Sequence, residues 1–523
     1  MLKSLSPQHQ ATNGASRSIR THALNLLSEV VASHDVRLDL KEVGTVVGLN
    51  EGVATVAGLP HVRLGELLEF GHGCHGLALD LASQSVGVVL LDESGSLAAG
   101  SRVRRTRRVF EVPVGEELLS RVVDPLGRPL DNRGPVRTRQ YRPADGEAPP
   151  VMDRAPVTVP LQTGLKVVDA LVPVGRGQRE LILGDRQTGK TSLAIDTILN
   201  QRDQDVICIY CAIAQRTTSV ARVVDTLRQH AALDYSVVVA AEPDSPAGAQ
   251  YIAPYAATAM AEWFMHHGRD VLIVYDDLTA HARAYRELSL LMRRPPAREA
   301  YPGDIFYLHS RLLERATHLR EELSGGSITA LPIAETEAQN LSAYIPTNLI
   351  SITDGQIYLS PELFRKGQLP AVDVTRSVSR VGGKTQLPAY RRVASHLRLA
   401  YAQFEELEKF ARFSSQLEPE TLARITHGRR VREILKQGLH DVLTVPDQIS
   451  DLLAVTSGSL DDVPLSDVWP VASRVRSIAA DRRPDLMNAL ATGKRLSDEE
   501  LDELRSTITS AAALAGKAND ADS

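Results

Sequence analysis

One run, ELILGDRQTGKTSLAID at 180–196, has the residue types and spacing needed to hold phosphate groups. It fits the phosphate-loop pattern G-x-x-x-x-G-K-[ST], between an apolar run typical of a strand and a run typical of a helix. The glycines let backbone N–H groups approach phosphates, and the helix N-terminus favours negative charge. We predict a site for a nucleoside triphosphate with Mg²⁺, in which Lys190 reaches the β- and γ-phosphates and Thr191 binds the metal. The loop residues are Gly184, Asp185, Arg186, Gln187, Thr188, Gly189, Lys190 and Thr191. A Gly-rich turn without a ligand is the alternative interpretation.

A second apolar run, DVLIVYDD, ends in two adjacent carboxylates. A strand ending at Asp276 places that carboxylate at the C-terminal edge of a parallel sheet, where the water shell of the metal should lie. Asp277 can instead cap the helix that follows. Together with the phosphate loop, this strand predicts that Asp276 contributes to the Mg²⁺ site, through water.

Cleavage of the nucleotide also requires a residue that deprotonates the attacking water. In enzymes of this build it is typically a Glu at the end of the strand after the phosphate-loop helix. Here that strand continues into AQRTTS and offers Gln215, whose amide cannot accept a proton as a carboxylate does. The sequence therefore favours a site that binds the nucleotide without cleaving it, unless Gln215 is only a loop residue and the base lies elsewhere.

The elements that must position these residues form an α/β domain, expected at 110–388. Its nearly continuous apolar runs, typical of buried parallel strands, are RELILGD, DVICIYCAI, SVVVAA and DVLIVYDD. Residues 41–109 carry short β runs separated by turn residues, as in a small barrel. Residues 389–523 are helical in period, with one apolar stripe of Val393, Leu397, Ala400, Phe404 and Leu407. Residues 1–40 should form a polar tail and a short docking helix carrying Ile19, Ala23, Leu26 and Val30.

The composition narrows the function classes. A net charge of −5 gives no support to a general role at nucleic acids or membrane surfaces, and no run reaches the roughly 18 apolar residues that span a bilayer. Three cysteines suggest a reducing compartment. Cys208 and Cys211 form a C-x-x-C within an apolar run, where a strand would point them to opposite faces, so we interpret them as core residues. The GHGCHG segment around Cys74 looks like a loop, and we expect no metal there.

Longer motifs give the chain a resemblance to the α subunit of the F-type rotary ATP synthase, over about residues 40–440. In the family's order, they are LGRPLDNRGPV, QTGLKVVDALVPVGRGQRELILGDRQTGKT, YDDL, RRPPAREAYPGDIFYLHSRLLERA, SAYIPTNLISITDGQIYL and SVSRVG. The resemblance implies a β-barrel, a RecA-like nucleotide-binding domain and a C-terminal helical domain. It also implies that the α nucleotide site is non-catalytic, in agreement with Gln215.

The resemblance further implies partners. In the family, three α subunits alternate with three β subunits around a rotating γ shaft, and the δ subunit binds at the N-terminal helix of α. The complex couples ATP synthesis or hydrolysis to proton or sodium transport at the cytoplasmic face of the bacterial inner membrane, as a peripheral assembly that α joins to the membrane sector only indirectly. Arg380 of SVSRVG should reach the catalytic site of the adjacent β subunit, where its planar fork can bind phosphate oxygens. The chain alone should be inactive.

Several positions depart from the common family pattern. Phe364 and Gln437 match nucleotide-contacting positions, but Leu369 and Leu439 replace an Arg and a Gln that border the adenine. We therefore expect a change in nucleotide affinity or base selectivity. Further departures are Ala214 and Ala297 in place of Gly, and Ala280 and His281 in place of Lys and Gln. The segments SVSRVGGKTQLPAYR, YAQFEELEKFARF and YDDLTAHARAYRELS look more like the alternative lineage of bacterial F-type ATPases.

Two other function classes share this kind of core. A nucleic-acid motor such as a Rho-like helicase would draw support from RVRRTRR at 102–108. A lone basic run at the end of a β region is more often a solvated strand face, and few aromatic residues are available for base stacking, so we expect no nucleic-acid partner. A self-sufficient secretion-type ATPase would need a catalytic Glu at position 215 and gives no role to SVSRVG. An ATPase assay of the purified chain, with and without RNA, separates these classes.

Overall fold

The computed structural model describes residues 42–522 except 96, 396 and 412–417. The tail and docking helix expected at 1–40 therefore lie outside the described residues. Residues Gly44–Ser523 form one compact unit, so the boundaries expected near residues 109 and 388 remain predictions. Within the described part of the chain, no helix is long and apolar enough to cross a membrane.

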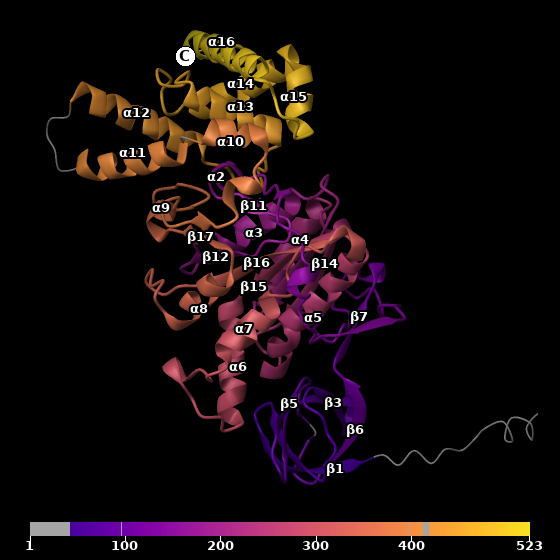
Figure 1. Cartoon of the computed structure of the whole chain (residues 1–523). Helices are drawn as coiled ribbons and strands as arrows, with labels where there is room; N and C mark the ends of the chain where they lie inside the picture. The colour runs from indigo at the N-terminus through magenta and orange to yellow at the C-terminus, as the bar shows by residue number, and fades with distance from the viewer. Residues whose placement is uncertain (1–41, 96, 396, 412–417, 523) are drawn as a thin grey trace, which may run out of the picture. The chain divides into compact units, whose positions relative to one another are not determined.

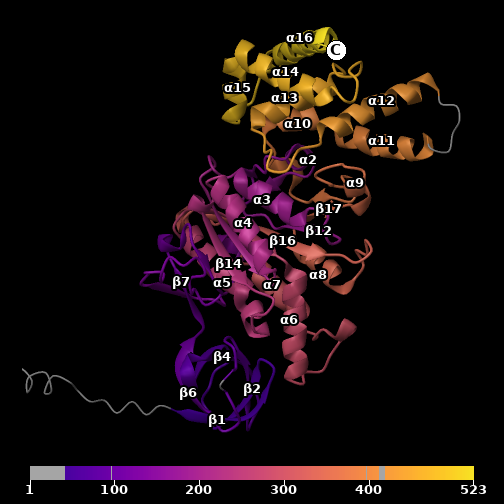
Figure 2. The same cartoon turned by 180° about the vertical axis from the view of Figure 1, so that it is seen from behind.

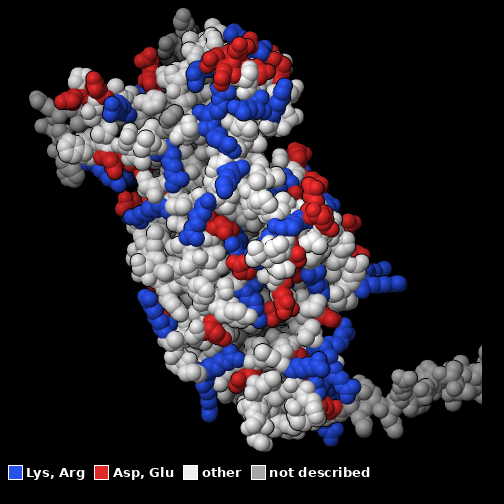
Figure 3. Space-filling view, in the orientation of Figure 1, with Lys and Arg blue, Asp and Glu red and all other residues white. Residues whose placement is uncertain are grey.

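The first elements form a closed barrel with the strand order β1-β2-β5-β4-β3-β6, as the short β runs predict. Its strands are β1 (Val43–Asn50), β2 (Val53–Ala57), β3 (Glu66–Phe70), β4 (His75–Leu81), β5 (Val86–Leu90) and β6 (Arg102–Val109). The basic run lies in β6, where Arg104 and Arg105 pair with Glu69 (2.8 Å) and Glu66 (2.9 Å) on β3. Figure 3 shows basic side chains gathered on the visible face of the barrel, with acidic side chains beside them. The run is thus an ion-paired strand face.

The central α/β domain is built on an eight-stranded sheet with the order β18-β17-β12-β16-β15-β13-β14-β8. All neighbours are parallel except β17 and β18, which are antiparallel. The strands are β8 (Val122–Val123), β12 (Glu180–Gly184), β13 (Val206–Ile213), β14 (Ser236–Ala241), β15 (Asp270–Asp276), β16 (Ser327–Glu335), β17 (Gly355–Leu359) and β18 (Val378–Ser379). The four apolar runs become β12, β13, β14 and β15, which confirms the α/β prediction (Figure 1).

Helices cover both faces of this sheet, because its strands are apolar on both sides. One hydrophobic core joins the sheet to α2 (Lys166–Leu171), α3 (Lys190–Leu199) and α4 (Thr217–Gln229). The other joins it to α5 (Ala247–His266), α6 (Leu278–Leu291), α7 (Ile305–Leu313) and α8 (Tyr344–Ile352). Cys208 packs in the first core and Cys211 in the second, so the two thiols of β13 do point to opposite faces.

Short elements complete the domain. They are the paired strands β7 (Glu111–Val114) and β9 (Gln140–Pro143), the paired strands β10 (Pro160–Leu161) and β11 (Val174–Gly175), and the helix α9 (Pro361–Arg365). Segment 71–76, expected as a loop, begins with a 3-10 turn at Gly71–Gly73, and β4 starts at His75.

The C-terminal region is helical, as the sequence predicts, and both views show α11 and α12 side by side (Figures 1 and 2). Its helices are α10 (Pro388–Ala394), α11 (Leu397–Ala411), α12 (Pro419–Ile434), α13 (Val445–Thr456), α14 (Val468–Arg482), α15 (Pro484–Ala491) and α16 (Asp498–Asp522). The expected single stripe is divided, since Val393 belongs to α10 and the later positions to α11. Ala400 is exposed, and it lines a groove between α11 and α12 together with Phe404 and Leu407, on the same face as the rest of the stripe.

Candidate functional site

The phosphate-loop segment connects β12 to α3 at the C-terminal edge of the sheet. A Cβ atom on Gly184 would lie 2.7 Å from Thr188 Oγ1 and 2.9 Å from Leu359 O, so only glycine fits there. Gly189 has φ 95°, a left-handed value that glycine adopts without strain. Thr188 Oγ1 donates to Asp185 O (2.9 Å) and braces the turn. The segment therefore has the strand–loop–helix geometry that the motif requires.

The ammonium group of Lys190 lies within the loop. Its Nζ donates to Gly184 O (2.9 Å) and to Asp185 O (2.7 Å), and the residue is only 8% exposed. Burial lowers the pKa of Lys190, while the neighbouring carboxylates, led by Glu335, oppose that shift. The side chain is thus placed at the start of α3, where backbone N–H groups can meet an anion.

Three side chains meet the carboxylate of Asp276 at the end of β15. Thr191 Oγ1 (2.7 Å) and Tyr210 OH (2.9 Å) donate to Oδ2, and Gln215 Nε2 (3.1 Å) donates to Oδ1. Burial raises the pKa of Asp276, and the hydrogen bonds from Thr191 and Tyr210 act against that rise. The structure therefore brings Thr191, Gln215 and Asp276 together, as the sequence predicts.

The second carboxylate of YDD has a different place. Asp277 is the N-cap of α6, and its Oδ1 accepts a hydrogen bond from the N–H of Ala280 (2.6 Å). Burial, followed by the charge of Asp276, raises the pKa of Asp277 to about 7. Of the two possible roles for Asp277, the structure gives it the capping role.

The oxygen donors at this point suit a hard divalent cation. Mg²⁺ is usually held by one or two protein oxygens together with water and substrate phosphates. The Thr191 hydroxyl and the Asp276 carboxylate offer such a pair at the start of α3. Within the described ranges, no group of three or more His, Cys, Asp or Glu side chains could hold a metal without a nucleotide. The residues thus fit a Mg²⁺ ion that arrives with the nucleotide.

The outer rim of the loop is fixed by residues that follow β16. The Asp185 carboxylate accepts from Thr336 Oγ1 (2.6 Å) and from the N–H of Gln339 (3.0 Å). Arg186 is exposed, and its Nε donates to Glu335 Oε2 (3.0 Å). Asp185 and Arg186 are therefore tied to the rim, and their nucleotide contacts remain predictions.

Three of the four residues expected near the base are exposed apolar side chains. Phe364, Leu369 and Leu439 are 41%, 42% and 64% exposed. Gln437 is buried, and its amide accepts from the N–H of Lys166 (2.6 Å) and donates to Gly164 O (2.8 Å). Both ends of this amide are occupied within the chain, which leaves it little capacity for a base. Its hydrogen bonds therefore do not support a polar contact with the base, and its predicted nucleotide contact remains a prediction.

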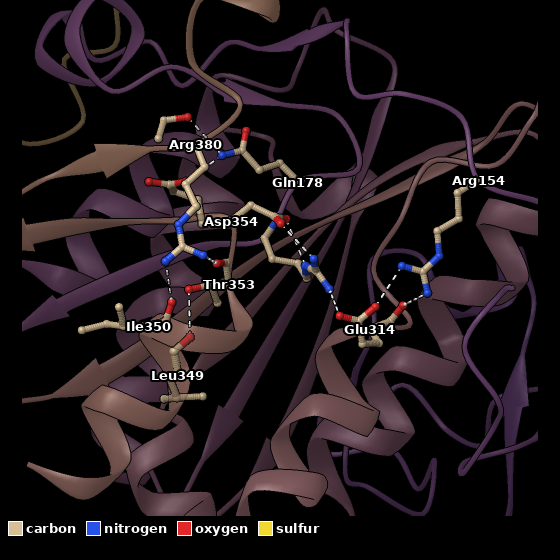
Figure 4. A network of polar contacts seen from close by, with 11 residues as sticks. Arg154, Gln178, Glu314, Leu349, Ile350, Thr353, Asp354 and Arg380 are labelled. Atoms are coloured by element: carbon tan, nitrogen blue, oxygen red, sulfur yellow. Dashed lines mark hydrogen bonds and ion pairs between the residues drawn. The ribbon is translucent and has the colours of Figure 1, made fainter. Parts of the chain in front are cut away.

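Arg380 lies apart from this cluster, directly after the edge strand β18. It is exposed, and its guanidinium donates to the carbonyls of Thr353 (3.2 Å) and Ile350 (3.4 Å) at the C-terminal end of α8 (Figure 4). None of its hydrogen bonds goes to the residues around Lys190. Its place on the sheet edge is compatible with a role outside its own nucleotide site.

Comparison with known proteins agrees with this geometry. The ATP synthase α/β family models match the β-barrel domain at 39–107, the nucleotide-binding domain at 164–379 and the C-terminal domain at 386–511. ATP synthase subunit alpha 1 of Rhodopirellula baltica is 59% identical over 482 residues, covering 92% of this chain and 96% of that protein. ATP synthase subunit alpha 2 of Syntrophotalea carbinolica is 62% identical over 480 residues, covering 92% of each chain. The chain belongs to the family of ATP synthase α subunits.

Two residues around the site of this α subunit had no role in the sequence prediction. Tyr210 donates to Asp276 from the neighbouring strand β13, and Glu335 ends β16 beside the phosphate loop. Glu335 has a sequence signal, since it is a carboxylate at the C-terminal end of an apolar run, like Asp276. Tyr210 lies within a buried strand and has no such signal. Both residues complete the polar surroundings of Lys190 and Asp276.

Proposed function

We propose that this chain is the non-catalytic, nucleotide-binding α subunit of an F-type ATP synthase that couples ATP synthesis or hydrolysis to proton or sodium transport. The observation that carries this proposal is the amide of Gln215, which lies 3.1 Å from the Asp276 carboxylate. An amide can orient a water molecule but cannot remove its proton at neutral pH. Family membership supports the rotary complex, and the site chemistry supports the non-catalytic role.

The chain's own residues then act as follows. The loop N–H groups and Lys190 would bind the phosphates of ATP or ADP, and Mg²⁺ would be held by the Thr191 hydroxyl and, through water, by Asp276. When bound, Mg²⁺ neutralises phosphate charge and fixes the conformation of the triphosphate. Gln215 donates its N–H to Asp276 and keeps that carboxylate oriented. The site therefore retains a nucleotide rather than turning it over.

The test is hydrolysis by the purified chain. It should bind Mg-ATP and leave it intact over hours, because the residue after β13 that would activate the water is Gln215, whose amide cannot remove a proton. A Gln215→Ala variant serves as the control for a contaminating ATPase, whose activity it would leave unchanged. Steady hydrolysis by the pure protein that Gln215→Ala abolishes would contradict the non-catalytic assignment.

The proposed contribution to catalysis is Arg380, acting in trans. Its exposed position after the edge strand β18 allows the guanidinium to reach a neighbouring subunit. An arginine that meets developing charge on a transferred phosphoryl group contributes about 10³ to 10⁵ in rate. We assign it to the catalytic site of the adjacent β subunit, in a hexamer of alternating α and β around γ, with δ at the N-terminal helix of α.

The proposal includes a location and a lineage. We place the subunit on the cytoplasmic face of the bacterial inner membrane, as a peripheral component linked only indirectly to the membrane sector. We also assign it to the alternative bacterial lineage, on the segments quoted above; the related α subunits carry the numbers 1 or 2 in their names. Co-purification with a β-type partner in equal amount tests the assembly.

A further inference from the structure

The backbone around Arg380 is held by a turn between α8 and β17. The N–H of Arg380 donates to Asp354 O (2.8 Å), and its guanidinium donates to Thr353 O (3.2 Å). Two of the contacts of Arg380 therefore end on the Thr353–Asp354 turn (Figure 4). The direction in which Arg380 leaves the sheet edge depends on how firmly this turn is fixed.

Arg179, directly before β12, clamps that turn. Its Nε and Nη2 donate to the two carboxylate oxygens of Asp354, at 3.0 and 2.8 Å, and its main-chain N–H adds a third bond at 3.0 Å. The Arg179 side chain is only 14% exposed. A bidentate guanidinium–carboxylate pair with this little exposure fixes orientation as well as position.

The same segment holds the residue before Arg380. Gln178 is fully buried, and its Nε2 donates to Ser379 Oγ (3.2 Å) and to Glu180 Oε2 (2.7 Å). Its Oε1 accepts from the N–H of Gly175 (2.8 Å), so the amide has a single possible orientation. Ser379 Oγ in turn donates to Pro173 O (2.7 Å). The consecutive residues Gln178 and Arg179, directly before β12, thus bind Ser379 and Asp354, the two residues that hold the backbone of Arg380 in place.

We propose that Arg179 is a positioning residue for Arg380, acting through Asp354, and that Gln178 supports it by fixing Ser379. This inference rests on the proposed role of Arg380 in the adjacent catalytic site. A guanidinium that meets phosphate oxygens bidentately must be placed to within about 0.5 Å. A displacement of about 1 Å at a reacting group can cost about 10² in rate. The Arg179–Asp354 pair would fix the position of the Arg380 guanidinium. Arg179 directly precedes β12, and the phosphate loop begins at the other end of that strand.

A matched control lies one step further along the same network. Arg179 Nη1 and Arg154 Nη1 both pair with Glu314, at 2.5 and 2.8 Å, and Arg154 contacts neither Asp354 nor Arg380 through any described hydrogen bond (Figure 4). Arg154→Gln removes the same charge from the same ion-pair network as Arg179→Gln. Arg154→Gln leaves the bidentate Arg179–Asp354 pair in place. A comparison of the two variants therefore separates the loss of Arg380 positioning from the general effect of losing an ion pair to Glu314.

The experiment measures ATP hydrolysis by reconstituted αβγ complexes, with assembly checked by gel filtration. Arg179→Gln should lower kcat about 10- to 100-fold and change the KM for Mg-ATP less than about twofold. Arg154→Gln should stay within about twofold of wild type. Arg179→Lys should recover only part of the loss, because a point charge cannot reproduce the bidentate pair.

A double-mutant cycle shows whether Arg179 acts through Arg380. In an Arg380→Ala background, Arg179→Gln should cause no further loss of kcat. An equal loss in both backgrounds, or a normal kcat for assembled Arg179→Gln, would overturn the inference while leaving the role of Arg380 intact. If Arg380→Ala alone keeps normal turnover, the proposed function of Arg380 fails instead. Should Arg179→Gln block assembly, Asp354→Asn carries the same test, because it preserves side-chain volume, removes the negative charge and replaces one of the two oxygens that accept from Arg179 by an NH2 group.

Discussion

His281 stands where the family usually has Gln, and the structure buries it completely. Its Nε2 lies 3.0 Å from Tyr251 O, and its ring stacks on that of Tyr251 at a centroid distance of 5.8 Å. Its Nδ1 has no hydrogen-bond partner among the described residues. Burial lowers the pKa of His281 to about 4. The folded chain therefore keeps a neutral imidazole under conditions in which the unfolded chain has bound a proton.

This difference makes stability depend on pH. Between the ordinary histidine pKa of about 6.5 and a folded pKa of about 4, the unfolded chain binds the extra proton, so acidification favours unfolding. The slope is about 1.4 kcal/mol per pH unit. His281 thus lowers the free energy of unfolding by about 2 kcal/mol between pH 6.5 and pH 5, and by about 3 kcal/mol at pH 4. His281→Gln should remove this part of the acid sensitivity.

The assay is urea unfolding of the purified chain at pH 5 and pH 7.5. The loss of stability between the two pH values should be about 2 kcal/mol smaller in His281→Gln than in wild type. His309 is also buried, and burial lowers its pKa to about 3, so some acid sensitivity should remain. Equal losses in wild type and His281→Gln would refute the reasoning.

Two further predictions concern other departures from the family pattern. Ala214 has φ 54°, a left-handed value that costs a residue with a Cβ about 1 kcal/mol, so Ala214→Gly should raise the melting temperature by about 1 °C without changing nucleotide binding. A lower melting temperature in differential scanning fluorimetry would contradict this. Leu369 and Leu439 offer an apolar surface where polar side chains would select the base, so competition binding should show less than tenfold preference for ATP over GTP. Leu369→Arg with Leu439→Gln should raise that preference, and a wild-type preference above about 100-fold would refute the interpretation.

Much of the fold follows from local pattern. The apolar runs that become β12 to β15 are continuous because parallel strands covered by helices are buried on both faces. The same reasoning separates Cys208 from Cys211, since successive residues of a strand face opposite sides and these two residues are three positions apart. The phosphate loop and Asp276 were predicted for a similar reason: both lie at strand ends, where a parallel sheet gathers its polar side chains.

The remaining features depend on contacts between distant parts of the chain. Gln437 bonds to the backbone of Lys166 across 271 positions, and Arg179 pairs with Asp354 across 175. The periodicity of apolar residues along a helix or strand does not predict pairs of residues this far apart in the sequence. The exposure of Ala400 likewise depends on how α11 and α12 pack, which a stripe of apolar residues does not specify. The sequence could therefore predict which residues gather at the strand ends, but not which partners occupy their hydrogen bonds.

We propose above all that this α subunit contributes to catalysis by placing its own Arg380 in the catalytic site of a neighbouring subunit. The most direct measurement is multi-site ATP hydrolysis by assembled αβγ complexes with Arg, Ala or Lys at position 380. Arg380→Ala should leave nucleotide binding to α nearly unchanged and lower turnover about 10³-fold, equivalent to about 4 kcal/mol of transition-state stabilisation. Arg380→Lys should rescue little, because it lacks the bidentate fork. An Arg380→Ala complex that assembles and retains more than about a tenth of wild-type turnover would contradict the account.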